Sequence, residues 1–210
     1  MKFKILQVGP YGVNCTALRA NGRVILVDPG AEASRLAAQL AADGLVPTAI
    51  LLTHAHFDHI GGIPGLLARF PNLPVFLHPA DIPVFSHPFN QMPPDYPHID
   101  PPPTLLPLDA RQTTPLFAAN EEFGDLQVIE TPGHTPGGVC YYFPSDKLLL
   151  SGDTLFAGSV GRTDFPGGDM ASLRTSLEKI AALPDDTRVI PGHGPLTTIA
   201  VERRSNPFLR

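Results

Sequence analysis

Histidines are concentrated in one short run of the chain, and their spacing indicates a metal site. Three of the eight histidines fall within six residues, in His54-Ala55-His56-Phe57-Asp58-His59. Imidazole and carboxylate groups are ligands for first-row divalent ions, zinc above all, with iron and manganese also accommodated. A catalytic ion typically has three protein ligands and keeps a further position open. Because His54, His56, Asp58 and His59 offer four ligands, the run predicts two metal ions.

Three later segments share a pattern in which an apolar run leads to a glycine that precedes a histidine or an aspartate. They are Pro132-Gly133-His134, Ser151-Gly152-Asp153 and Pro191-Gly192-His193. Glycine lets the backbone turn sharply or approach a neighbour closely, so the next side chain can point to a common centre. One histidine after a glycine is equally consistent with a structural role. The three segments and the first cluster together, however, offer seven nitrogen and oxygen ligands.

The elements expected along the chain place these residues at the ends of strands. β-Rich runs predict strands over residues 2–8, 13–19, 24–28, 48–52, 75–77, 126–130, 138–143, 147–151 and 187–190. Composition and spacing predict helices over residues 31–42, 65–70 and 170–183, with Asp169 as the N-cap of the last one. The dipeptide Asn21-Gly22 predicts a hairpin turn. The order of the elements favours a mixed α and β fold, with two sheets and helices packed outside them in one domain.

Composition excludes several classes of protein. The chain has 210 residues and a net charge of −5, with no basic run to neutralise phosphates, so no nucleic-acid partner is expected. No stretch approaches the ~20 apolar residues of a membrane span, and the N-terminus lacks the apolar core of a signal peptide. We therefore expect a cytoplasmic protein without a membrane partner. The chain has only two cysteines, Cys15 and Cys140, which are far apart in the sequence, so a disulfide framework and a thiolate zinc site are excluded. We expect both cysteines to be small buried residues.

Prolines gather in one segment. Nine of the 25 prolines lie between residues 88 and 115, so this segment cannot hold a regular helix or a central strand. We expect a surface segment at about residues 88–115, which serves either as a lid over the site or as a subunit contact. The sequence does not indicate an oligomeric state. His78, His87 and His98 lie outside the ligand pattern and are expected at the surface.

The order and spacing of these residues resemble the metallo-β-lactamase superfamily. The resemblance rests on His54-x-His56-x-Asp58-His59, followed by His134, Asp153 and His193, and it includes the turn Asp28-Pro29-Gly30. It implies an α+β fold, a four-layer αββα sandwich that forms a single domain over residues 1–210, with the site at the strand ends.

The resemblance also implies how two metals are held. The first ion would be bound by His54, His56 and His134, the second by Asp58, His59 and His193, and Asp153 would bridge the two. The cofactors would be two divalent ions, zinc foremost, with iron or manganese as the other options. We expect Asp28 to orient a ligating histidine, because such ligands usually give their second ring nitrogen to a carboxylate or a carbonyl.

Three further segments are similar to the short, single-domain glyoxalase II-like bacterial hydrolases. They are SGDTLF at residues 151–156, GRTDF at residues 161–165, and the tail that runs from Glu202-Arg203 to Asn206-Pro207-Phe208-Leu209. This resemblance implies a metal-dependent hydrolase of a small-molecule thioester, of the hydroxyacylglutathione type. The nucleophile would be a metal-bound hydroxide, since a metal lowers the pKa of bound water from 15.7 to ~7. Asp58 would be a ligand and also orient the hydroxide. Arg162 would contact an anionic group of the substrate; alternatively, it pairs with Asp164 or with a backbone carbonyl.

Other activities on this fold stay open. The run GRTDF also resembles persulfide dioxygenases, which would bind one iron through His54, His134 and Asp153. A hydrolase of lactones or other esters, of phosphodiesters or of β-lactams would use the same ligands. A metal-binding redox module without enzymatic activity is the remaining alternative.

Overall fold

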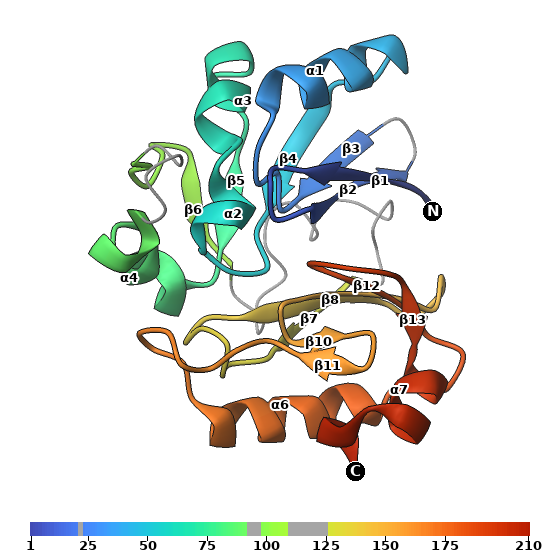
Figure 1. Ribbon diagram of the computed structural model, residues 1–210. Helices are drawn as coiled ribbons and strands as arrows, with labels where there is room; N and C mark the ends of the chain where they lie inside the picture. The colour runs from blue at the N-terminus through green and yellow to red at the C-terminus, as the bar shows by residue number, and fades with distance from the viewer. Residues whose placement is uncertain (21–22, 92–97, 109–125) are drawn as a thin grey trace. The chain divides into compact units, whose positions relative to one another are not determined.

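Two units make up the chain, Met1–Leu108 and Asp109–Arg210. The structure, a computed structural model, describes residues 1–20, 23–91, 98–108 and 126–210 (Figure 1). Each unit contains a mixed sheet with helices on one of its faces, so the predicted mixed α and β class is confirmed. The expectation of a single domain stays a prediction.

The first unit is built on a six-stranded sheet in the order β1-β2-β3-β4-β5-β6. The pairs β1/β2 and β2/β3 are antiparallel, whereas β3 to β6 are parallel neighbours. Parallel neighbours run in one direction, so the C-terminal ends of β3 and β4 lie at the same edge of the sheet. The strands are β1 (Lys2–Val8), β2 (Val13–Ala20), β3 (Arg23–Val27), β4 (Pro47–Leu51), β5 (Val75–Leu77) and β6 (Leu105–Pro107).

Helices α1 (Ala33–Ala42) and α3 (Ile63–Arg69) cover one face of this sheet (Figure 1). Leu36 of α1 and Leu66 of α3 are buried in one cluster with strand residues that include Ile50 of β4. This core anchors β4, the strand that leads into the histidine cluster. Four shorter helices complete the unit: α2 (Phe57–Ile60), η1 (Pro79–Asp81), α4 (Ile82–Phe85) and η2 (Pro88–Gln91).

The second unit is built on a five-stranded sheet in the order β13-β12-β9-β8-β7. The pair β9/β12 is parallel and the other neighbours are antiparallel. A separate hairpin joins β10 (Leu155–Phe156) to β11 (Ser159–Val160). The strands of the sheet are β7 (Gln127–Glu130), β8 (Val139–Phe143), β9 (Leu148–Gly152), β12 (Arg188–Pro191) and β13 (Thr197–Thr198).

Helix α6 (Met170–Ala181) provides most of the helical cover of the second sheet (Figure 1). Asp169 caps it as predicted, because its carboxylate accepts a hydrogen bond from Ser172 N–H at 2.7 Å. Leu173, Leu177 and Ile180 point from α6 into a buried cluster with strand residues of the sheet. The chain then forms α7 (Ile199–Ser205) and η4 (Pro207–Leu209).

The predicted strands agree with the structure to within one residue at each end, and the predicted helices to within two. Strands β6, β10, β11 and β13 and helices α2, α4 and α7 were not predicted, because segments of two to seven residues show little periodicity. Asn21-Gly22 lies outside the described residues, although β2 and β3 on either side of it do pair antiparallel.

The described part of the proline-rich segment contains η2 and the strand β6. β6 lies at the edge of its sheet and ends in a proline. Proline has no backbone N–H to donate, and an edge strand tolerates this loss because one of its sides has no neighbouring strand. The expectation that this segment holds no central strand therefore agrees with its described part. Residues 92–97 and 109–115 of the segment lie outside the described residues, so its role as lid or contact stays a prediction.

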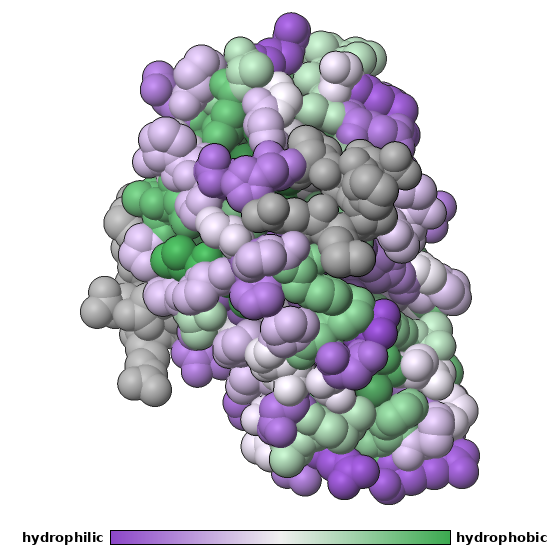
Figure 2. All heavy atoms as spheres, turned by 60° about the vertical axis from the view of Figure 1, so that its left-hand side comes forward, coloured by the Kyte–Doolittle hydropathy of each residue, from purple (hydrophilic) through white to green (hydrophobic). Residues whose placement is uncertain are grey.

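Within the described part of the chain, the large apolar side chains that are exposed are distributed over several elements and the loops between them. They are Tyr11, Val46, Ile82, Leu106, Leu196, Val201 and Phe208. On the face drawn in Figure 2, hydrophobic areas alternate with hydrophilic side chains. Within the described ranges, no helix combines the length and the apolarity needed to cross a membrane.

Both cysteines are fully buried, as the sequence predicts, and are not joined in a disulfide. Burial raises the pKa of the Cys140 thiol to about 11 and lifts the pKa of Cys15 further above its usual range. Since the thiolate is the reactive form, we expect neither cysteine to react with a disulfide reagent such as DTNB at pH 7.5 in the folded protein. Unfolding in guanidinium should release two thiols per chain. A rapidly reacting thiol in the folded protein would contradict this burial.

Candidate metal centre

The first histidine cluster lies in the loop that leaves β4, the strand between β3 and β5. His54, His56 and His59 are buried, and the ring centroid of His54 lies 4.8 Å from that of His56 and 4.1 Å from that of His59. Asp58 Oδ2 lies 4.0 Å from His59 Nε2, and both residues belong to the short helix α2. The loop and the helix α2 that follows it therefore gather the four ligands that the sequence predicts in this unit.

Asp28 follows the neighbouring strand β3 and holds the start of this loop. Its Oδ1 accepts a hydrogen bond from Thr53 N–H at 2.8 Å, and its Oδ2 accepts one from the Thr53 hydroxyl at 2.6 Å. Asp28 Oδ2 also lies 3.1 Å from His59 Nδ1, and Thr53 Oγ1 lies 3.1 Å from His54 Nδ1. Both Nδ1 atoms thus face protein oxygens, which leaves the Nε2 atoms for a metal. This arrangement agrees with the expected orienting role of Asp28.

Two buried polar residues beyond β5 fix the backbone between the histidines. Asp81 Oδ2 accepts a hydrogen bond from Ala55 N–H at 3.0 Å. Asn90 Oδ1 accepts one from Phe57 N–H at 2.7 Å, and the Asn90 amide donates to the Ala55 carbonyl at 2.7 Å. Sequence reasoning missed Asp81 and Asn90, because a single polar residue in a 3₁₀ helix of three or four residues has no spacing that marks it as buried.

The turn Asp28-Pro29-Gly30 packs directly against the histidine loop. A Cβ atom on Gly30 would lie 1.6 Å from the Asp58 carbonyl oxygen. A Cβ atom on Gly62 would lie 2.4 Å from the Pro29 carbonyl oxygen, which accepts a hydrogen bond from Gly62 N–H at 2.8 Å. Only glycine allows such contacts between backbones, so this close packing explains the Gly in the turn.

The three remaining predicted ligands come together in the second unit. His134, Asp153 and His193 follow the strands β7, β9 and β12 respectively. Asp153 Oδ2 lies 3.5 Å from His134 Nε2 and 3.6 Å from His193 Nε2. Two imidazoles therefore converge on one carboxylate oxygen. His193 is the most exposed of the three, with 25% of its side chain accessible, and its ring meets Phe156 edge to face.

The loop after β11 orients the His134 ring through a backbone atom. His134 Nδ1 lies 2.7 Å from the Arg162 carbonyl oxygen. A carbonyl can only accept a hydrogen bond, so Nδ1 carries the proton and the Nε2 lone pair is left for a metal. A Cβ atom on Gly161 would lie 1.8 Å from the Asp153 carbonyl oxygen, so glycine is needed for this close approach. Sequence reasoning singled out Arg162 for its side chain and did not identify this carbonyl.

The Arg162 side chain makes the ion pair that was one of its two predicted alternatives. Its Nε and Nη2 atoms donate to the two carboxylate oxygens of Asp164, each at 2.6 Å. The guanidinium holds the pKa of Asp164 at about 2. The role of Arg162 as a substrate contact stays a prediction.

Histidines outside the ligand pattern make local contacts. His78 Nδ1 and His87 Nδ1 accept hydrogen bonds from Ala80 N–H and Phe89 N–H, and His98 lies 2.9 Å from Asp100. His87 and His98 are exposed as expected, whereas His78 is half-buried.

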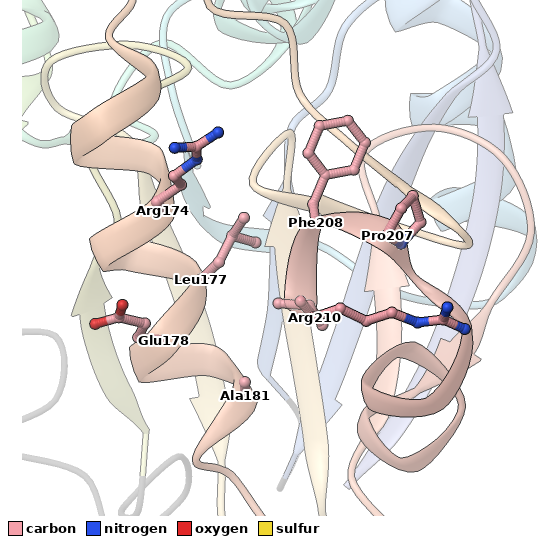
Figure 3. A pocket seen from close by; sticks show the side chains of 8 residues that line it. Arg174, Leu177, Glu178, Ala181, Pro207, Phe208 and Arg210 are labelled. Carbon is pink, nitrogen blue, oxygen red and sulfur yellow. The ribbon is translucent and has the colours of Figure 1, made fainter.

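A pocket of about 580 Å³ lies in the second unit, between α6 and η4. In Figure 3, Arg174 and Leu177 point from α6 toward Phe208 of η4. None of the predicted ligands lines this pocket, so it is separate from the chemistry that the histidines indicate.

The donor chemistry of both clusters fits divalent metal ions. The first offers three imidazoles and a carboxylate, and the second offers two imidazoles and a carboxylate. In His54, His59 and His134 the Nδ1 atom already faces a protein oxygen, which is the arrangement that metal-ligating histidines adopt.

Removing the Asp81 carboxylate tests how far the histidine loop depends on it. In Asp81→Ala the buried Ala55 N–H loses its acceptor, which should destabilise the protein by ~1–3 kcal/mol. We expect a lower Tm and less metal per chain after dialysis, measured by elemental analysis. Asp81→Asn keeps an acceptor oxygen and should recover part of both. Asp100→Ala, which changes an exposed carboxylate, is the control. Wild-type metal content and stability in Asp81→Ala would show that this hydrogen bond does not support the loop.

Comparison with known proteins agrees with this geometry. Residues 8–193 match the model of the metallo-beta-lactamase superfamily. A probable metallo-hydrolase, YqgX of Bacillus subtilis, is 36% identical over 220 residues, which cover 100% of this chain and 98% of that protein. The hydroxyacylglutathione hydrolase GloC of Haemophilus influenzae is 34% identical over 216 residues, which cover 100% and 98%. The crystal structure of TTHA1623 in a di-iron-bound form is similar with a TM-score of 0.88 and 40% identity, over 98% of this chain and 100% of that one. The family model, the relatives and the similar structure agree with the predicted fold, and they show that the chain belongs to the metallo-beta-lactamase superfamily.

Proposed function

We propose that the two ligand sets form one dinuclear centre. In this centre, the first ion is held by His54, His56 and His134, the second by Asp58, His59 and His193, and Asp153 is shared. The observation that carries the proposal is the position of Asp153 Oδ2, within 3.6 Å of the Nε2 atoms of both His134 and His193. The similarity to a protein that has been crystallised in a di-iron-bound form supports two ions. The same ligands accommodate zinc, iron or manganese.

The proposed reaction is hydrolysis of a thioester of the hydroxyacylglutathione type. When bound, two divalent ions supply a water of lowered pKa and polarise the carbonyl that is attacked. Asp58 is a ligand in this proposal and also accepts a hydrogen bond from the attacking water. A thiolate leaves with little assistance from a general acid, so the reaction demands no further acidic residue.

The substrate class is supported by GloC, a hydroxyacylglutathione hydrolase that aligns with this chain over its full length. A match over nearly the whole of both chains means that this relative performs its reaction in a protein of similar extent. The acyl group and the thiol carrier are therefore proposed together, as a small-molecule glutathione thioester.

Hydrolysis of S-lactoylglutathione by the purified, metal-analysed protein tests this function. We expect turnover with close to two metals per chain. His54→Ala and Asp153→Ala should lower the turnover by more than about a hundredfold, because loss of a partner that merely orients a ligand already costs 10- to 100-fold. His98→Ala, an exposed histidine outside the clusters, should retain wild-type turnover.

Three results would contradict the proposal in different ways. No turnover with two metals per chain would exclude this thioester as the substrate. A single iron per chain with oxygen uptake on a persulfide would replace the hydrolase with the dioxygenase. Full turnover by His54→Ala after complete loss of metal would exclude the metal-dependent mechanism.

A further inference from the structure

The loop that follows β11 contacts two of the proposed ligands through its backbone. The Arg162 carbonyl oxygen accepts the hydrogen bond from His134 Nδ1 at 2.7 Å. Next to it, Gly161 is packed so closely that a Cβ atom would lie 1.8 Å from the Asp153 carbonyl oxygen and 3.1 Å from His134 Nδ1. The position of this one loop therefore affects the orientation of the His134 ring and the backbone of Asp153.

The side chain of Arg162 is fixed by the residues that follow it. Its guanidinium makes two parallel hydrogen bonds to the carboxylate of Asp164, each at 2.6 Å. Its Cζ atom lies 3.7 Å from the centroid of the Phe165 ring, so the guanidinium stacks on this ring. A planar guanidinium held at two points and on one face has little freedom to rotate.

These contacts restrain the backbone of the loop. Arg162 and Asp164 are two residues apart, so a side-chain pair between them limits the dihedral angles of the peptide units that they enclose. The pair is exposed and would add little to the stability of the whole protein. Because the pKa of Asp164 is held at about 2, the pair stays charged throughout the neutral pH range.

The loop is also closed at its other end. Gly168 N–H donates to the Phe165 carbonyl at 2.8 Å. A Cβ atom on Gly168 would lie 2.4 Å from the Thr163 carbonyl oxygen. The segment 161–168 is therefore a tight loop, closed by contacts of its own backbone.

We propose that Arg162, Asp164 and Phe165 form a clamp that sets the direction of the Arg162 carbonyl and so orients His134 toward its metal. The three are positioning residues, because they act through His134 and not on the substrate. The inference depends on the proposed role of His134 as a ligand, and it is independent of the substrate. It gives the Arg162 side chain a different role from the predicted contact with a substrate anion.

Substitutions of the clamp leave the hydrogen-bond acceptor in place, because the acceptor belongs to the backbone. We would compare Arg162→Ala, Asp164→Ala and the double variant with the wild type, all loaded with zinc. Arg162→Lys keeps the charge but loses the two-point geometry. Asp186→Ala is the matched control, since it removes an exposed ion pair of the same unit, the one with Lys147, away from the ligands.

The first measurement is the exchange with water of the His134 Nδ1 proton, observed by NMR in protein with ¹⁵N-labelled histidine. We expect exchange at least about tenfold faster in both alanine variants, with the exchange of ring protons on the first-unit histidines unchanged as an internal reference. The second measurement is the release of zinc to a chelator, which we expect to be ~10-fold faster, within the 10- to 100-fold range of lost orienting partners. The double variant should match the single variants, because either substitution opens the clamp.

The activity on S-lactoylglutathione separates the clamp from a substrate contact. A clamp lowers kcat in Arg162→Ala and Asp164→Ala alike and leaves KM within about twofold. A raised KM in Arg162→Ala alone, with wild-type proton exchange and zinc release, would overturn the clamp in favour of an anion contact. Variants that match Asp186→Ala in both measurements would also overturn it. Exchange and zinc release are measured without substrate, so failure to hydrolyse the thioester counts against the proposed function and not against the clamp.

Discussion

An imidazole that binds a metal through one ring nitrogen almost always places its other nitrogen against a carboxylate, a backbone carbonyl or a water molecule. In the proposed centre, His59 Nδ1 lies near the carboxylate of Asp28, His54 Nδ1 near the hydroxyl of Thr53, and His134 Nδ1 near the carbonyl of Arg162. The Thr53 hydroxyl donates its own proton to Asp28, so its oxygen is left to accept from His54. One buried carboxylate therefore lies against His59 directly and reaches His54 through the Thr53 hydroxyl.

The sheets supply the rigidity that this arrangement needs. In the first unit, β3 and β4 are parallel neighbours, and Asp28 N–H donates to the Leu51 carbonyl at 3.1 Å where the two strands end. In the second unit, β9 and β12 are parallel neighbours, and Gly192 N–H donates to the Gly152 carbonyl at 2.8 Å. The residues after these paired ends include Asp153 and His193, so the register of the strands places both. Residues that follow neighbouring parallel strands therefore start from adjacent positions at the same edge of the sheet.

The metal chemistry could be predicted from the sequence because few residue types serve as ligands. Histidine and aspartate directly after apolar runs were sufficient to identify both clusters and the strands that lead to them. The partners that hold the ligands could not be found in this way. Asp81 and Asn90 lie in the short 3₁₀ helices η1 and η2, where nothing in the local sequence separates a buried polar residue from an exposed one. A backbone carbonyl such as that of Arg162 is present at every position, so only the three-dimensional structure shows which one accepts from a histidine.

The same contrast explains why the reaction class is easier to infer than the substrate. Ligands are constrained by the metal, by their second ring nitrogen and by the backbone contacts of Gly30 and Gly161, so little variation is compatible with binding. The residues beside them are under weaker constraints. Tyr11 is half exposed in the turn between β1 and β2, and its ring contacts the ring of Phe57 edge to face. Phe57 stands between two proposed ligands in the sequence, but many other side chains could make the same contact. A substrate is selected by exposed groups of this kind, whose identity is not fixed by the metal. Two members of one superfamily can therefore share every ligand and act on different molecules.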